Sequence, residues 1–364
     1  MTGAREPGET GGAGVRPPLL GLLEPELFEA IRGVAPERYR AGQVLRWIHE
    51  RRARSFEEMT DLPKALREAL AASFEVGVAD VASRTPAEDG AEKFLFALAD
   101  GARVEAVYLP GRPAGRQGEG SRAAVCVSSQ AGCALDCAFC VTGRLGSGRN
   151  LTAGEIVGQY LVIARERGLG PSEANVVFMG MGEPLLNVPN VLRALDLLER
   201  EVAPRRITVS TAGVVPGIEA LAKRKRLPNL AVSLTAADDA TRSRLMPVNR
   251  TWPIESLFAS LARWPLPAGR RITFEVALVS GENDSDEDAR KLARLVARVP
   301  SKVNLIPLNE SPEWLPSLRR PAEERIDAFA RVLVAAGVPV TVRRSKGLGA
   351  AAACGQLKGR QERR

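Results

Sequence analysis

The chain has 364 residues, of which 45% are hydrophobic and 26% are charged. These are ordinary values for a packed soluble protein, and they exclude disorder as the main state. The length allows one large α/β domain with an appendage, or two ordinary domains. No apolar stretch approaches the roughly 18 residues of a membrane-spanning helix, and the first residues lack the apolar core of a signal peptide. We therefore expect a cytoplasmic protein with no membrane association.

The charge and the histidine content restrict which partners and which kinds of active site are possible. Lys and Arg number 51 against 43 Asp and Glu, which gives a formal net charge of +8. An excess of positive charge favours a polyanionic partner such as RNA, although many basic proteins bind none. The chain has a single histidine, His49. Zinc sites that need two histidines are therefore excluded, and a Ser-His-Asp triad would need His49, which is far in sequence from any glycine-rich turn.

The N-terminal part of the chain divides into two predicted segments. Residues 1–18 are rich in Gly, Pro and Thr and are expected to form a mobile arm. Over residues 19–82, apolar residues recur at helical spacing, with interruptions at Pro36 and Pro63. This pattern predicts a small helical unit.

Residues 83–122 contain two alternating apolar runs, KFLFALA and RVEAVYLP, which are joined through Asp100-Gly101. An Asp-Gly pair between alternating runs is a strong signal for a β-hairpin. The glycine-rich stretch at 111–122 predicts a loop that links this hairpin to the rest of the chain.

After the loop, short β-branched runs alternate with helical stretches, which is typical of parallel βα units. The strands are expected at 123–129, 175–180, 206–211, 230–235, 272–279, 302–308 and 339–345, and the helices near 152–167, 189–200, 216–226, from about 239, 285–298 and 322–336. Six such units fall short of a closed eight-stranded barrel. We therefore expect an α/β fold with a partial, open (β/α)6 barrel over residues 123–357 and a basic tail at 358–364. A doubly wound sheet is the alternative.

Polar residues follow successive predicted strands. They are Cys133 to Cys140, Gly180 to Glu183, Ser210, Ser233 with Thr235, and Asn309. In a (β/α) barrel the carboxyl ends of the strands all face one mouth, where the chemistry takes place. A doubly wound sheet would gather such groups at one switch point instead.

Three of the five cysteines form a C-x3-C-x2-C pattern, at Cys133, Cys137 and Cys140, immediately after a predicted strand. In a cytoplasmic protein, closely spaced cysteines indicate metal or redox chemistry more often than disulfides. A structural zinc knuckle needs a fourth ligand, which no nearby histidine offers. A [4Fe–4S] cluster with three protein ligands would leave one iron free for a small molecule.

This cysteine pattern, on the loop after the first strand of a partial barrel, resembles the radical S-adenosylmethionine (SAM) superfamily, in which SAM binds the free iron. Further motifs are YRAGQVLRWIHE, SFEEMTDLP, VEAVYLP, CVSSQAGC, GMGEPLLN, STAGVVP, LAVSL, MPVNR and AACGQL. Together, over about residues 20–357, they resemble the adenosine methyltransferases that methylate adenine C2 in rRNA and tRNA. The related resistance enzymes that methylate adenine C8 share the same motifs.

The resemblance implies a radical reaction, because adenine C2 has no lone pair to attack the SAM methyl group directly. Cys354 would first accept a methyl group from one SAM molecule. A second SAM, bound at the cluster, would yield a 5′-deoxyadenosyl radical that activates this methyl group for addition to adenine. Cys126 would then close a transient disulfide with Cys354 to release the RNA, and Glu105 would accept the proton. Taken alone, Cys126 in the run VCV would be interpreted as a buried apolar cysteine.

The resemblance also places SAM contacts at the strand ends. Gly182 and Glu183 are expected to bind the SAM amino group, because backbone carbonyls and a carboxylate suit a cation. Further SAM contacts are expected at Ser210, Ser233, Leu234, Thr235 and Asn309. The alternative is that these polar residues only cap the helices that follow.

The implied partners are RNA, namely 23S rRNA and additionally tRNA, and an electron donor such as flavodoxin or ferredoxin, and we expect a monomer. The helical unit at 19–82 resembles the RNA-binding appendage of this family. Candidate RNA contacts are the basic residues at 143–149 and 224–226, Arg343, Arg344, Lys346 and the tail. For 224–226 the alternative is a solvated helix face.

Three places depart from the family pattern. Thr235 stands where the family usually has histidine, and Glu310 follows Asn309 where proline is usual. Residues 348–352 lack the acidic residues that usually precede Cys354. A divergent paralogue with another RNA target would show changes of this kind.

Three other functions stay open at the level of sequence. A C8 methyltransferase would use the same cysteines. A radical SAM enzyme for a peptide or small metabolite would have no need of Cys354 and Cys126. A non-catalytic iron–sulfur RNA-binding protein would keep its function when Cys354 is replaced.

Overall fold

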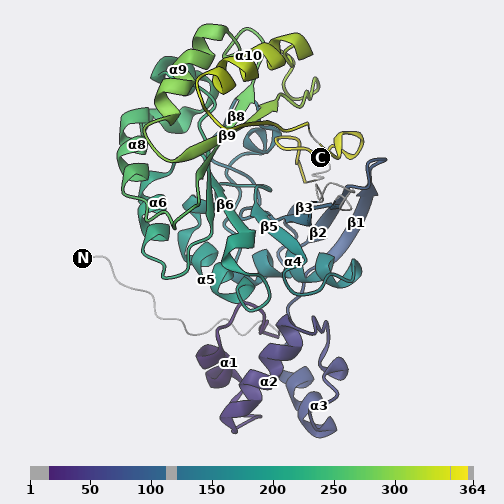
Figure 1. Ribbon diagram of the computed structural model, residues 1–364. Coiled ribbons are helices and arrows are strands. Elements are labelled where there is room, and N and C mark those ends of the chain that lie inside the picture. The colour runs from purple at the N-terminus through teal and green to yellow at the C-terminus, as the bar shows by residue number, and fades with distance from the viewer. Residues whose placement is uncertain (1–15, 112–120, 345, 360–364) are drawn as a thin grey trace, which may run out of the picture. The chain divides into compact units, whose positions relative to one another are not determined.

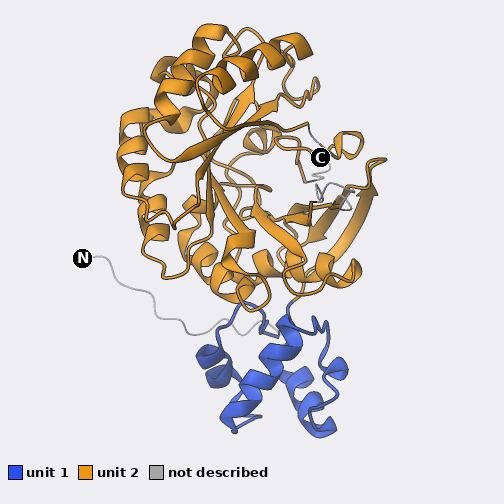
Figure 2. Ribbon diagram, viewed as in Figure 1, with its two compact units in different colours: residues 1–77 blue, residues 78–364 orange. Residues whose placement is uncertain are grey.

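The structure is a computed structural model that describes residues 16–111, 121–344 and 346–359. The chain forms two compact units, residues 1–77 and 78–364 (Figure 2). Residues 1–15 of the expected N-terminal arm, and most of the expected basic tail, lie outside the described residues. Residues 17 and 18 at the end of that arm are not mobile as expected, because Pro18 forms a β-bridge with Glu75 and the Pro17 carbonyl accepts from the Glu75 N–H. No described helix is long and apolar enough to cross a membrane.

The described part of the first unit is helical, as predicted. Its helices are α1 (Glu24–Ile31), α2 (Arg38–His49) and α3 (Lys64–Ser73), with a 3-10 turn at Phe56–Glu58. Each helix buries apolar side chains on one face, among them Ile31, Leu45 and Leu70. Pro63 immediately precedes α3, a place where its missing N–H leaves no helical hydrogen bond unmade.

The second unit is built on one ten-stranded sheet whose strands follow one another in chain order (Figure 1). The strands are β1 (Asp80–Pro86), β2 (Glu92–Ala97), β3 (Arg103–Leu109), β4 (Ala123–Cys126), β5 (Ala174–Phe178), β6 (Ile207–Thr211), β7 (Asn229–Ser233), β8 (Ile272–Leu278), β9 (Ser301–Pro307) and β10 (Val340–Val342). Strands β1 to β4 pair antiparallel, and β4 to β10 pair parallel. A doubly wound sheet would reverse its strand order at a switch point. The unbroken order confirms the predicted partial barrel with its six βα units.

Strand β1 is the element that the sequence analysis missed. It begins at Asp80, inside the range 19–82 that the sequence predicts to be helical, and the first compact unit ends at Gly77. All of its residues except Val81 are exposed. An exposed edge strand has no buried face, so it lacks the apolar alternation by which strands are identified.

The predicted hairpin is formed by β2 and β3. The two strands pair antiparallel from Glu92 opposite Tyr108 to Ala97 opposite Arg103. Gly101 has a φ of 82°, a conformation that glycine adopts without strain. The Asp-Gly signal therefore located the turn correctly.

Helices cover the outside of the curved sheet (Figure 1). They are α4 (Ala153–Glu166), α5 (Val188–Leu198), α6 (Val215–Ala222), α7 (Asp239–Leu245), α8 (Ile254–Ala262), α9 (Asp286–Val296) and α10 (Glu323–Ala335). The single helix predicted from about 239 is in fact α7, a 3-10 turn and α8. Pro247 opens the 3-10 turn and Pro253 immediately precedes α8. Each proline lacks the N–H that a continuous helix would need, which explains the division.

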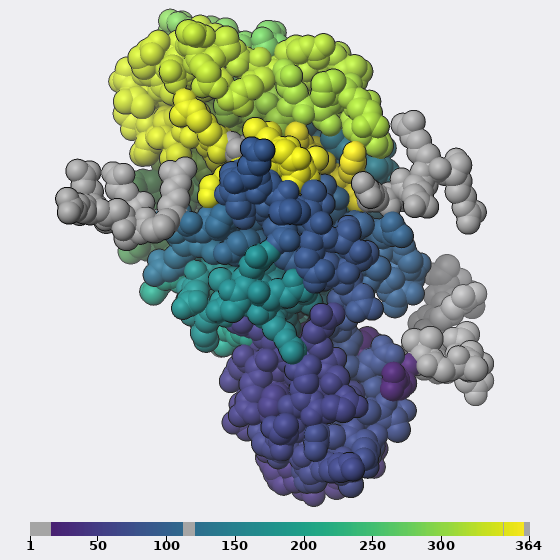
Figure 3. Space-filling model, turned by 90° about the vertical axis from the view of Figure 1, so that its right-hand side faces the viewer, coloured from purple at the N-terminus to yellow at the C-terminus, as the bar shows by residue number. Residues whose placement is uncertain are grey.

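The segment 346–359 follows β10 and returns across the barrel to β2 and β3. Its Ala351 carbonyl accepts a hydrogen bond from Lys93 Nζ at 3.3 Å, and its Lys358 N–H donates to Glu105 Oε2 at 2.9 Å. In the space-filling view the yellow surface of this C-terminal region lies against the blue surface of the hairpin (Figure 3). The segment brings Cys354 to the mouth of the barrel.

Candidate active site

The loop that follows β4, which we name the cluster loop, holds Cys133, Cys137 and Cys140 in local turns. The Cys133 N–H donates to the carbonyl of Gly146 at 2.8 Å, and the Cys140 N–H donates to the carbonyl of Cys137 at 3.0 Å. A further backbone bond, donated by the N–H of Ala138, ties the loop to the end of α7. The backbone therefore fixes the three thiols at the carboxyl end of the sheet.

The three thiols line a cavity of about 180 Å³, which we name the cluster cavity. It lies at the carboxyl ends of the parallel strands, where barrels of this kind hold their chemistry. Its lining includes Cys133, Cys137, Cys140, Gly182, Glu183, Ser210, Ser233, Thr235, Asn309 and Cys354. Glu275, from β8, lines the same cavity and was missed by the sequence analysis. It occupies a strand position with buried neighbours, where sequence gives no sign of a cavity.

Three polar atoms in the cluster cavity are buried without a partner. They are Thr235 Oγ1, Glu275 Oε2 and Asn309 Oδ1, none of which has a hydrogen-bond partner among the described residues. A buried polar atom left unpaired costs free energy. These three atoms therefore favour a polar ligand in the cavity.

Thr235 also has a φ of 61°, which is unusual for a β-branched residue and is typical of functional sites.

The GMGEP loop after β5 is held tightly in place. Gly182 has a φ of 93°, and a Cβ at this position would lie 2.4 Å from Gln130 Cβ. The Glu183 N–H donates to Gln130 Oε1 at 2.8 Å, and the Glu183 carboxylate accepts from the N–H of Leu185 at 2.9 Å and of Ala212 at 2.7 Å. Burial raises the pKa of Glu183 to about 6, although these N–H donors act in the opposite direction. The loop presents a buried carboxylate at a fixed position.

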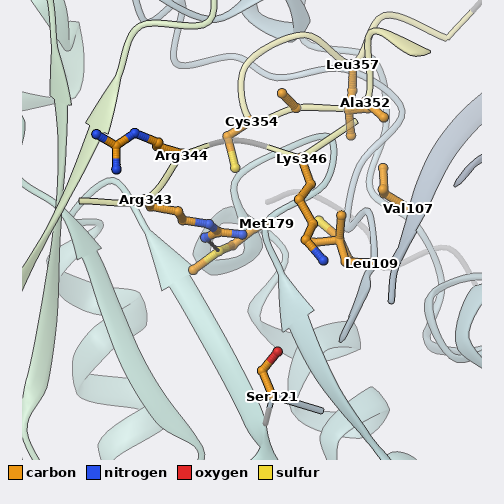
Figure 4. Close-up of a pocket in the computed structure, with 12 residues that line it drawn as sticks. Val107, Leu109, Ser121, Met179, Arg343, Arg344, Lys346, Ala352, Cys354 and Leu357 are labelled. Carbon is orange, nitrogen blue, oxygen red and sulfur yellow. Dashed lines mark hydrogen bonds between the residues drawn. The ribbon is translucent and has the colours of Figure 1, made fainter. Parts of the chain in front are cut away.

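A second cavity, of about 310 Å³, adjoins the first, and we name it the cysteine cavity. Cys126 and Cys354 both line it, and the side chains of Cys354, Arg343 and Lys346 extend into it (Figure 4). Burial raises the pKa of Cys126 to about 12, and the positive charge of Arg343 opposes the rise. Arg343 Nη1 lies 3.8 Å from Met179 Sδ, a weak acceptor. Cys354 is therefore shared by both cavities, with the cluster-loop thiols on one side and Cys126 on the other.

The segment around Cys354 is docked against the cluster loop and the residues that follow it. The Val141 N–H donates to the Gly355 carbonyl at 2.8 Å, and Thr142 Oγ1 donates to the Leu357 carbonyl at 2.7 Å. Asn309 Nδ2 donates to the carbonyl of Cys354 at 2.9 Å. Asn309 thus uses its amide nitrogen to hold Cys354 and leaves its oxygen in the cluster cavity.

Two predicted site residues do not line either cavity in this arrangement. Glu105 is 2% exposed, its Oε1 lies 3.2 Å from Lys93 Nζ, and its Oε2 accepts from the Lys358 N–H. Leu234 is fully buried, and its carbonyl accepts from Arg242 Nε at 3.1 Å. Both residues lie beside the site and not in it.

The chain resembles known proteins in both of its compact units. Residues 18–76 match the family described as ribosomal RNA large subunit methyltransferase N-terminal domain, and residues 127–295 match the radical SAM superfamily. A dual-specificity RNA methyltransferase RlmN from Geobacter sulfurreducens is 44% identical over 344 residues, which cover 93% of this chain and 91% of that protein. The chain belongs to the RlmN family. A probable dual-specificity RNA methyltransferase RlmN from Thermus thermophilus is 44% identical over 345 residues, which cover 93% and 92%.

A solved structure agrees with this placement. A radical SAM methyltransferase from Sphaerobacter thermophilus matches the fold with a TM-score of 0.87 and 42% identity, over 94% of this chain and 100% of that one. As a member of the RlmN family and the radical SAM superfamily, the protein is a radical SAM methyltransferase, and its cofactors are a [4Fe–4S] cluster and SAM.

The residues in the cluster cavity fit these cofactors. Three thiols line the cavity together with the unpaired polar atoms of Thr235, Glu275 and Asn309, and most of the remaining lining residues are apolar. Across the described ranges, no three His, Cys, Asp or Glu side chains are placed to share a single metal ion. The thiolates of a [4Fe–4S] cluster bind different irons and do not need to meet at one point. The donor set is therefore suited to a cluster beside a polar ligand.

Arg242 is a supporting residue that the sequence analysis missed. It is fully buried, and its guanidinium donates to the carbonyls of Ala212 at 2.7 Å and Leu234 at 3.1 Å and to Asn249 Oδ1 at 2.7 Å. Burial lowers the pKa of Arg242 to about 10. The residue cross-links the ends of β6 and β7. An arginine in a short polar helix gives no sequence signal of such burial.

Most of the candidate RNA-binding residues are engaged within the protein. Arg149 bonds to Asp100 and Glu155, and Arg224 bonds to Asp196 and Glu199. Further intramolecular contacts are made by Arg144 with Asp136, Arg226 with Glu199, Arg344 with Glu323, and Lys346 with the Pro110 carbonyl. Arg343 lies inside the cysteine cavity. Residues 224 and 226 lie beyond α6, which ends at Ala222, and the Arg224 side chain is only 11% exposed, so the structure does not show the expected solvated helix face there.

Proposed function

We propose that this radical SAM methyltransferase acts on RNA and methylates ring carbon C2 of adenine in 23S rRNA and additionally in tRNA. The reaction would proceed through a methyl group carried on Cys354 and a transient disulfide between Cys354 and Cys126. The observation that carries the proposal is the position of Cys354, which lines both the cluster cavity and the cysteine cavity. A thiol that carries a methyl group must receive it at one place and be separated from the product at another. Cys354 has access to both cavities.

The chain's own residues would divide the work at the cluster cavity. Cys133, Cys137 and Cys140 would hold the cluster, whose free iron would bind SAM. SAM would lie against Gly182, Glu183, Ser210, Ser233, Thr235 and Asn309, with Leu234 supporting the wall from behind. When bound, these cofactors supply a methyl group and the radical chemistry that an unreactive ring carbon requires. The buried Glu183 carboxylate suits the SAM ammonium group, since it has lone pairs left after accepting two N–H bonds.

The cysteine cavity would serve methyl transfer and release. Cys354 would carry the methyl carbon, so that an adenine placed in the cavity would become linked to its sulfur. Cys126, on the wall of the same cavity, would form a disulfide with Cys354 as the bond between that sulfur and the product carbon breaks, and the proton lost by the Cys126 thiol would balance the one that completes the methyl group on that carbon. By the resemblance to the family, Glu105, which lies beside the cavity and not in its lining, would accept the proton lost from the ring carbon. Arg343 interacts electrostatically with both cysteines, and its positive charge would stabilise a thiolate on either of them.

The remaining partners belong to the same proposal. The helical first unit would contact RNA, since residues 18–76 match the N-terminal domain of ribosomal RNA methyltransferases. A one-electron donor such as flavodoxin or ferredoxin would reduce the cluster, and the protein would act as a monomer. With ribosomal RNA as its substrate, it would work in the cytoplasm.

Mass spectrometry of nucleosides tests the proposal most directly. Purified rRNA and tRNA from cells with and without this protein are digested and compared. We expect 2-methyladenosine to appear only when the protein is present, and the RNA fraction that contains it names the substrate. A gain of 8-methyladenosine would assign the chain to C8 methylation instead. If neither nucleoside changes while the purified protein retains its cluster, the proposed substrate is wrong.

A further inference from the structure

The backbone on both sides of Cys354 is held by one buried ion pair. Lys93 Nζ, on β2, donates to the Ala351 carbonyl at 3.3 Å, three residues before the cysteine. Glu105, on β3, accepts from the Lys358 N–H at 2.9 Å, four residues after it. Lys93 and Glu105 are themselves 3.2 Å apart. The segment 351–358 is therefore anchored at each end by a different member of the same pair.

The pair is buried, so each of its charges depends on the few hydrogen-bond partners that it has. Lys93 is 8% exposed and Glu105 is 2% exposed. Two charges taken out of water are expensive unless each finds further hydrogen-bond partners. The only further partners that the described residues give to these two charged groups are the two backbone groups of the Cys354 segment. Detaching that segment would leave the pair short of partners, so the pair favours the docked state.

The register of the hairpin places this pair beside the cysteine cavity. Lys93 lies directly across from Val107, and Glu105 lies two residues before Val107 on the same strand, so all three share one face of the sheet. Val107 lines the cysteine cavity, whereas Glu105 does not. The Glu105 carboxylate is therefore not part of the cavity lining. One of its oxygens pairs with Lys93 and the other accepts from the Lys358 N–H.

We propose that Lys93 is a positioning residue that, together with Glu105, latches segment 351–358 and so holds the Cys354 thiol at the junction of the two cavities. The idea rests on the proposed function, in which Glu105 accepts a proton and Cys354 carries the methyl group. The carboxylate that accepts the proton is then the one that anchors the carrier segment. A proton taken up at Glu105 converts its charge from −1 to 0, removes the attraction to Lys93, and loosens the segment after the ring proton has left.

The test measures two thiol reactions that need neither SAM nor RNA. Cluster-containing protein is prepared without oxygen as wild type, Lys93→Met, Lys93→Arg and Lys291→Met, where Lys291 lies on α9 and controls for the loss of one lysine. The first measurement is the rate at which iodoacetamide alkylates Cys354, followed by peptide mass spectrometry. The second is the rate at which diamide closes the Cys126–Cys354 disulfide.

We expect Lys93→Met to change the two rates in opposite directions. Alkylation of Cys354 should rise by roughly tenfold, because the segment opens more often when its anchor is gone. Disulfide closure should slow by roughly threefold or more, because the thiol spends less time beside Cys126 and its effective concentration falls. Lys93→Arg should restore both rates in part, since a guanidinium can still pair with Glu105. Lys291→Met should leave both unchanged.

General destabilisation gives a different result, because opening of the whole fold would expose Cys126 as well and raise both rates together. That outcome, or wild-type rates in a folded Lys93→Met protein, would overturn the latch.

If Lys93→Met does not fold, Glu105→Gln provides the second test. The amide keeps its size and one acceptor but loses the charge, and it should raise Cys354 alkylation by about threefold. Wild-type rates in that variant would also overturn the proposal. None of these outcomes depends on whether RNA is the substrate.

Discussion

The loop that carries Cys133 to Cys140 and the segment that carries Cys354 line the same cavity but are built in different ways. The loop places three thiols within eight consecutive residues after β4. Its backbone bonds are made mainly within the stretch from Cys133 to Gly146, with a further bond from Ala138 to Leu245 at the end of α7. The segment holds Cys354 through partners that are 45 to 258 positions away in sequence. One part of the site is encoded locally, and the other exists only when the whole barrel is folded.

This difference has a functional consequence. A loop that is closed mainly by local bonds suits a rigid cluster. A segment held by a few distant hydrogen bonds and one ion pair can be released and docked again at modest cost. A carrier thiol that serves two cavities benefits from the second kind of construction. The predictions below test whether the two parts can be separated experimentally.

The largest effects are expected from removing one cysteine of each kind. Cys137→Ala should lose most of its iron and acid-labile sulfide and the brown colour of the cluster, because only two thiolates remain. Cys354→Ala should keep the full iron content but lose RNA methylation by roughly a thousandfold or more, since no other group can carry the methyl. Iron and sulfide analysis of protein prepared without oxygen, beside a methylation assay, separates the two losses. A colourless wild-type protein that contains zinc, or methylation by Cys354→Ala, would contradict the assignment.

Cys126→Ala should stop turnover after the first methyl transfer. Without the release thiol, RNA made in the same cells should stay covalently attached to Cys354. A denaturing gel with and without nuclease treatment detects the adduct, and the double variant Cys126→Ala with Cys354→Ala serves as the control that cannot form it. Recovery of RNA-free Cys126→Ala protein from cells that contain the substrate would count against the release role.

The contrast between the two regions also explains what the sequence could predict. The barrel was predicted correctly because strand–helix alternation is a local signal. Cysteine spacing is a local signal as well, and it indicated the loop whose three thiols line the cluster cavity. The burial of Arg242 and the pairing of Lys93 with Glu105 depend on contacts across the fold, which no local pattern records. Arg343 illustrates the limit, because a basic residue after β10 suggests a phosphate contact, whereas the structure places it in the cavity that Cys126 and Cys354 line.

Gly355→Ala should weaken the contact at which the two regions meet. Gly355 has a φ of 82°, and an added Cβ would lie 2.9 Å from the Phe139 carbonyl oxygen on the cluster loop. Gly337 is the matched control, because its φ of 77° is similar but an added Cβ would meet nothing within 4 Å. Both variants should lose about 1–2 kcal/mol of stability from the left-handed backbone. Only Gly355→Ala should also lower methylation several-fold, with its iron content intact.

If Gly337→Ala lowers methylation as much as Gly355→Ala, the effect comes from general destabilisation and not from the docking of Cys354. Thermal unfolding of the two variants, measured beside methylation at saturating SAM, provides the comparison. The expected result is a lower methylation rate in Gly355→Ala than in Gly337→Ala at a temperature at which both variants are fully folded.

The smallest effect is expected at a position where the cavity wall departs from the family pattern. Thr235→Val removes the unpaired Oγ1 but keeps the β-branched shape, so the unusual backbone conformation carries the same strain in both proteins. If this hydroxyl bonds to SAM, its loss should weaken SAM binding about threefold to tenfold, the value of one neutral hydrogen bond. Titration calorimetry of the cluster-containing protein with SAM measures the change, and Thr208→Val, on β6 outside the cavity lining, is the control. Because the binding energy at stake is small compared with that of the cluster thiolates, an unchanged affinity would remove only this contact from the SAM site. A tenfold loss would show that a hydroxyl at this position takes part in cofactor binding.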